Sequence, residues 1–128
     1  MNKFLFLLVF IFAPSVFSLE IVGVKNAQLQ DLYLYNGSRL KVYPEEGVLI
    51  TVEGKANKQV KLQIKTNGVV YLTPGVRIEN LQPKQKIITL NKYGEGEFTI
   101  GFSLLGEKNI SGKHSKRIKY QVDYLDGD

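Results

Sequence analysis

The chain has 128 residues, a formal net charge of +5 and no cysteine. The lack of cysteine excludes disulfide bonds, thiolate metal sites, a cysteine nucleophile and a cysteine-linked lipid anchor. The modest positive charge fits attraction to anionic partners such as lipopolysaccharide, glycans or nucleic acid, and it is more typical of proteins that only need charge to stay in solution.

The N-terminus has the three parts of a secretory signal peptide. Lys3 gives a positive start, residues 4–12 form an unbroken apolar run, and short side chains precede a cleavage point after Ser18. This run is about half of the roughly 20 residues that span a bilayer, so we expect no stable membrane anchor. The sequence therefore predicts a signal peptide over 1–18, export to the periplasm, the cell surface or the medium, and one domain over 19–128.

The remaining residues alternate between apolar and polar side chains with the period of half-buried strands, and no segment keeps a helical period over three turns. Glycine, proline and asparagine separate these segments as turn signals. The number and spacing of short strands predict an antiparallel β-sandwich or a small barrel. Ten strands are predicted, over Glu20–Val24, Leu32–Tyr35, Leu40–Tyr43, Val48–Val52, Val60–Ile64, Val69–Leu72, Val76–Ile78, Ile87–Leu90, Glu97–Leu104 and Ile118–Tyr124.

Two local patterns make sharper predictions. The pair Asn67-Gly68 predicts a tight hairpin between the strands on either side of it, because both residues tolerate a positive φ. The last strand is expected to face water with its charged and amide side chains and the core with Ile118, Tyr120, Val122 and Tyr124.

Two stretches of the chain resemble a bacterial secreted family known as domain of unknown function 4402. The likeness lies in Gly96–Leu104, followed by the turn and final strand of 110–124, and in the strand, glycine and polar turn of Leu49–Leu62. His114 and Lys116 stand where that family has tyrosine and glycine. The resemblance implies an immunoglobulin-like sandwich related to the subunits of surface fibres, with other subunits or a chaperone as partners. It also implies a C-terminal assembly signature in which a glycine precedes an aromatic residue by twelve positions on the last strand, as Gly112 and Tyr124 do.

The predicted cleavage point lies next to the first strand. The chain then has no spare donor segment before its fold, unless Leu19–Val24 is itself the donor. This position predicts a self-complete domain or a subunit at the end of a fibre.

No group of residues in the sequence has the pattern of a catalytic, metal or phosphate site. His114 is the single histidine, and a neighbouring serine does not make a nucleophile elbow or a triad. The acidic pairs lie in turns where charge is expected, and Gly94-Glu95-Gly96 lacks the lysine and the helix of a phosphate-binding loop. We therefore expect no enzyme activity, no metal and no cofactor.

Two surface features are candidate binding sites. The densest positive cluster could grip a polyanion, or could simply keep an edge strand from wrong pairing; it consists of Lys113, His114, Lys116, Arg117 and Lys119. It has no aromatic ladder, which argues against nucleic acid. Tyr33 and Tyr35 could contact a glycan or a protein if exposed, but we expect both faces of their strand to be at least half buried.

The sequence thus predicts an all-β, immunoglobulin-like antiparallel β-sandwich that is exported and non-enzymatic. Its expected role is that of a structural or adhesive, fimbrial-subunit-like module that acts by surface contact or strand addition. The alternative is a monomeric periplasmic or secreted binder of anionic ligands, such as an anionic glycan, that uses the lysine and arginine cluster.

Overall fold

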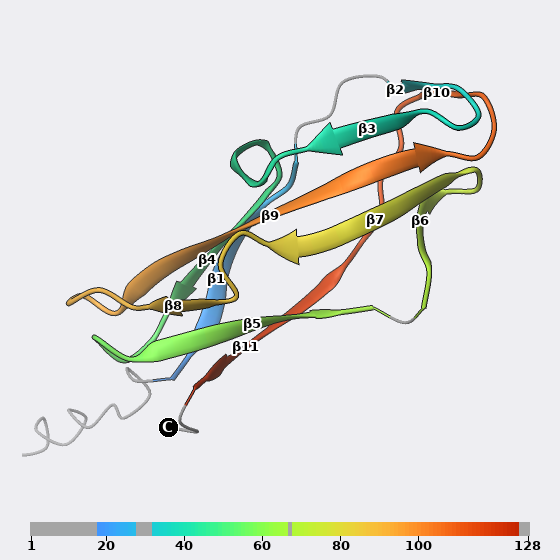
Figure 1. The fold of residues 1–128 in the computed structure, drawn as a ribbon. Helices are drawn as coiled ribbons and strands as arrows, with labels where there is room; N and C mark the ends of the chain where they lie inside the picture. The colour runs from blue at the N-terminus through green and yellow to red at the C-terminus, as the bar shows by residue number, and fades with distance from the viewer. Residues whose placement is uncertain (1–17, 28–31, 67, 126–128) are drawn as a thin grey trace, which may run out of the picture.

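The computed structural model describes residues 18–27, 32–66 and 68–125. Apart from the short 3-10 helix η3 (Pro44–Glu46), the regular structure in these residues consists of strands that form antiparallel sheets. The layers pack as a sandwich (Figure 1), so the predicted all-β antiparallel sandwich is confirmed. The strands are β1 (Glu20–Lys25), β2 (Leu32–Leu34), β3 (Arg39–Val42), β4 (Val48–Glu53), β5 (Gln59–Lys65), β6 (Val70–Thr73), β7 (Val76–Pro83), β8 (Ile87–Thr89), β9 (Glu95–Gly106), β10 (Ile110–Gly112) and β11 (Lys119–Tyr124).

The first sheet is built around β9, a strand of 12 residues that is hydrogen-bonded along both edges. β4 and β3 pair end to end with one edge of β9, and β7 pairs with the other edge. β1 extends the sheet beyond β4, and β6 extends it beyond β7. In Figure 1 β9 runs along the length of the molecule between β3 and β7.

The second sheet has the order β11-β5-β8, and β2 and β10 form a separate two-stranded ladder. In immunoglobulin-like domains one sheet holds strands A, B, E and D, and the other holds C, F and G. The order β1-β4-β9-β7 corresponds to A, B, E and D, and the pair β5–β11 corresponds to C and F. Within the described residues, no strand occupies the position of G beside the outer edge of β11.

The core consists of two clusters of buried side chains. The larger cluster joins β4, β5 and β9 around Phe98, Ile50 and Leu62, with the side chain of Leu90. The smaller cluster joins β2, β7 and β9 around Leu34, Val76 and Leu104, with Leu32. Alternation along each strand explains both clusters, because every second side chain turns to the same face of its sheet.

All ten predicted strands are present, and Tyr120, Val122 and Tyr124 of the last strand pack against the larger cluster as expected. Ile118, which was expected to face the core with them, precedes β11 and is not part of that packing. Two features differ. The structure adds the short strand β10, and β7 continues beyond Ile78 to Pro83. The extension passes an irregularity at Asn80, which takes a positive φ of 55° and lets the strand resume its pairing with β9.

The predicted hairpin at Asn67-Gly68 is wrong. Asn67 lies outside the described residues, but the flanking strands belong to different sheets: β5 pairs with β11 and β8, and β6 pairs with β7. The turn Pro74-Gly75 joins β6 to β7 instead, and Gly75 supplies the positive φ of 96°. The chain between β5 and β6 therefore crosses from one sheet to the other (Figure 1).

We predict that Gly94→Ala destabilises the fold more than Gly37→Ala does. Both glycines have a positive φ, of 77° and 87°, so alanine is strained at either position by about 1–2 kcal/mol. A Cβ at Gly94 would also overlap the carbonyl oxygen of Gly54, whereas a Cβ at Gly37 meets nothing within 4 Å. We expect a total loss of about 2–5 kcal/mol for Gly94→Ala, measured by urea unfolding. Equal losses in the two variants would show that the close approach of the two turns is unimportant.

Candidate functional site

β11 is an edge strand with hydrogen-bonding groups that no described strand uses. It pairs with β5 through one edge only. The amide of Leu125 donates to the carbonyl oxygen of Gln59 at 2.9 Å, so this opposed pair is hydrogen-bonded. Hydrogen-bonded and non-hydrogen-bonded pairs alternate along an antiparallel ladder. The N–H and C=O groups of Tyr120 and Val122 therefore point away from β5, toward the open edge.

The backbone just before β11 is also unpaired. β10 ends its pairing with β2 at Gly112, and β11 begins its pairing with β5 at Lys119. Residues 113–118 make no backbone–backbone hydrogen bond to any part of the chain that the structure describes. The open edge therefore extends from residue 113 through β11.

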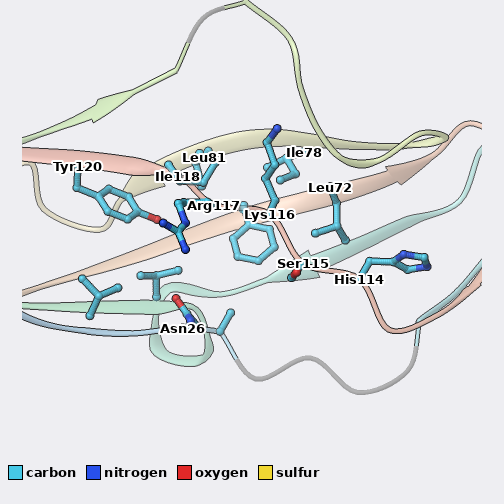
Figure 2. Close-up of a pocket in the computed structure, with 14 residues that line it drawn as sticks. Asn26, Leu72, Ile78, Leu81, His114, Ser115, Lys116, Arg117, Ile118 and Tyr120 are labelled. Carbon is cyan, nitrogen blue, oxygen red and sulfur yellow. The ribbon is translucent and has the colours of Figure 1, made fainter.

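β1 is the edge of the first sheet and approaches β11. Between them lies an open cavity of about 490 Å³. Val24 and the two residues after β1 line one side, and residues 114–118 with Tyr120 line the other. Figure 2 shows this cavity, with Asn26 at the bottom of the view and Ile78 and Leu81 at the top.

The floor of the cavity is apolar and incompletely covered. On the inward face of β9, Phe98, Ile100 and Leu104 have exposed fractions of 1%, 0% and 0%. Phe102 lies between them on the same face but is only partly buried, and it lines the cavity. Leu72, Ile78 and Leu81 are likewise partly buried there. The cavity is thus a gap between the two core clusters, at a place where sandwiches are normally close-packed.

The charged side chains that line the rim of the cavity are Lys116 and Arg117, and His114 lies beside them. Among the residues that the structure describes, no aspartate or glutamate lines the cavity. The side chains of Lys116 and Arg117 are exposed, and the ion pairs in the described residues use other cations, namely Arg39, Arg77 and Lys84. Among the residues that the structure describes, the site therefore combines a strand edge without a neighbouring strand, an apolar floor and a basic rim without acidic partners.

The structure divides the predicted positive cluster. Three of its residues, His114, Lys116 and Arg117, line the cavity, whereas Lys113 and Lys119 do not. Lys119 lies opposite Lys65 on the exposed face of the β5–β11 pair. The cluster is therefore a cavity rim and a separate strand face, rather than one patch.

The two residues of the predicted assembly signature lie on different strands. Gly112 is in β10, opposite Leu32, and Tyr124 is in β11, opposite Val60. The hydroxyl of Tyr124 accepts a hydrogen bond from the amide of Lys55 at 2.7 Å, so it holds the turn after β4.

The prediction that Tyr33 of β2 and the adjacent Tyr35 are at least half buried is wrong. They are 72% and 69% exposed, because among the described residues β2 pairs only with β10 and no second layer covers its outer face. Exposure leaves both side chains available for contacts, but they do not line the cavity.

The other polar side chains considered as sites have structural contacts. The Nε2 atom of His114 lies 3.0 Å from the carbonyl oxygen of Ser111. Glu45 accepts a hydrogen bond from Lys84 at 2.9 Å, which lowers the pKa of its carboxyl group. In the described residues no three metal-binding side chains gather, and no helix there is long and apolar enough to cross a membrane.

No protein-family model matches the chain, and no curated protein sequence matches it either. The likeness to the family of domain of unknown function 4402 therefore stays a prediction. Sequence patterns located the basic rim, but they missed the floor, because residues such as Phe102 have the same alternation as their fully buried neighbours.

We predict that ionisation of Tyr120 makes the protein lose stability at alkaline pH. Partial burial in the cavity wall raises the pKa of Tyr120, whereas the unfolded chain ionises near pH 10. The native state therefore holds its proton longer, and stability is full below about pH 10 and falls as the pH rises through the folded pKa. Tyr120→Phe should lose less stability than the wild type between neutral and alkaline pH in urea unfolding. The exposed control Tyr33→Phe should behave like the wild type, and the same slope in all three proteins would contradict this role.

Proposed function

We propose that this protein is an exported, non-enzymatic structural or adhesive module that works by strand addition. An extended segment of another polypeptide would lie between β1 and β11 and occupy the position of strand G. Main-chain hydrogen bonds to an open sheet edge give such additions their affinity, and side-chain pockets give their specificity. The expected site of action is the periplasm or the cell surface, as the signal-peptide pattern predicts.

One observation carries this proposal: the outward N–H and C=O groups of β11 lie beside an apolar floor that the fold leaves partly uncovered. Proteins usually protect an edge strand with bulges, charge or a covering segment. The residues with outward backbone groups include Tyr120 and Val122, whose side chains face the core. A strand added there would satisfy the backbone and complete the core at the same time.

We predict that Val122→Pro abolishes assembly while Val122→Ala preserves it. Proline removes the outward N–H of residue 122, whereas alanine removes a similar amount of packing and keeps that N–H. The bonds to β5 come from the neighbouring residues, so both variants should keep the strand spectrum in circular dichroism. When purified from the cells that export them, the wild type and Val122→Ala should carry a second polypeptide in a complex that survives SDS without heating and is sized by mass spectrometry, and Val122→Pro should be monomeric. A strictly monomeric wild type would count against strand addition.

The second candidate is a monomeric binder of anionic ligands. It is favoured by the basic rim, in which Lys116 and Arg117 have no acidic partner in the part of the chain that the structure describes. For this function, mature protein should be retained on an anionic matrix such as heparin and be released by salt. The double variant Lys116→Glu, Arg117→Glu should lose most of that retention. Retention that this variant leaves unchanged would exclude the rim as the binding site.

A further inference from the structure

The chemistry around the cavity specifies what kind of strand it accepts. This inference rests on the proposed function and concerns the partner of the same site. The charge of the cavity lies on one side, because Lys116 and Arg117 both belong to the segment 114–118, together with His114. The other polar side chains that line the cavity are Asn26, Ser115 and Tyr120, and the rest of the lining is apolar. Lys116 and Arg117 belong to residues 113–118, which lead into β11 and make no backbone–backbone hydrogen bond to the rest of the described chain.

The apolar floor requires alternate apolar side chains. A strand beside β11 turns every second side chain toward the core, as β11 itself does with Tyr120 and Val122. Such side chains would cover Phe102, Ile78 and Leu81, which are partly exposed in the gap between the two clusters. A flexible polyanion has no row of apolar groups at this spacing, so it would leave the floor open to water.

The basic rim requires a negative charge at one end of the strand. A neutral strand would cover Lys116 and Arg117 and leave them with less water and no opposite charge, which is unfavourable. A carboxylate close to them would form charge-assisted hydrogen bonds, and arginine can hold a carboxylate with two of them. Charge at the edge of an interface mainly sets partner choice and the rate of association.

We propose that the partner strand is an acidic amphipathic segment of another polypeptide. It has apolar side chains at alternate positions and at least one aspartate or glutamate that meets Lys116 and Arg117. The apolar positions complete the core, and the acidic end selects this partner among other extended segments.

Three synthetic peptides test the proposal. Each is longer than the six residues of β11 and alternates valine with threonine, and they differ only in ending with two glutamates, two glutamines or two lysines. Fluorescence anisotropy would measure their binding to the mature protein at low and at high salt. We expect the glutamate peptide to bind about five- to tenfold more tightly than the glutamine peptide, and the lysine peptide to bind most weakly. High salt should reduce these differences.

Two double variants locate the charge effect. In Lys116→Glu, Arg117→Glu the order of the peptides should reverse, so that the lysine peptide binds most tightly. The control Lys108→Glu, Lys113→Glu makes the same change of charge at exposed positions outside the cavity lining and should keep the original order.

The outcomes separate this inference from the function on which it rests. If all three peptides bind equally, the acidic preference is overturned and strand addition stands. If none of them binds, strand addition itself fails, and the inference fails with it. Binding of heparin without binding of the glutamate peptide would overturn the inference in favour of a polyanion ligand.

Discussion

The pairing of β9 along both edges is the interaction on which the rest of the fold depends. Its 12 residues hold β3 and β4 on one side and β7 on the other, and its inward side chains contribute to both core clusters. β9 links the two clusters through its consecutive inward side chains from Phe98 to Leu104. A change in the register of β9 by one residue would turn all of these side chains to the solvent.

The cavity between β1 and β11 follows from how the second layer covers β9. β5 and β11 cover the half of β9 that contains Phe98 and Ile100, and the β2–β10 ladder covers the end at Leu104. Residues 113–118 connect these two covering units without a ladder of their own. Phe102 lies beneath that connection, so it is the inward side chain that neither unit buries. The gap is a property of the topology rather than of a single small residue.

Alternation of side chains was sufficient to predict the strands and the sandwich, because each strand buries one face. It was not sufficient to predict which strands pair. The signal at Asn67-Gly68 is local, but the pairing of β5 with β11 joins residues far apart in the chain, and this long-range pairing prevailed. The exposure of Tyr33 and of Phe102 could not be read from the sequence for the same reason, since it depends on which layer covers each strand. The basic rim was predictable because its charges are consecutive in the sequence.

The two ends of β11 are held unequally. At one end, Tyr124 and Leu125 are fastened to Lys55 and Gln59 by hydrogen bonds of 2.7 and 2.9 Å. At the other end, Lys119 lies directly opposite Lys65, and like charges in opposed positions weaken a ladder. Local opening of β11 should therefore begin at Lys119, and amide protection against hydrogen exchange should rise toward Tyr124. β11 would thus open locally at its N-terminal end, beside the cavity, while its C-terminal end stays bound to the turn after β4. An incoming chain could begin to pair at the end that opens first.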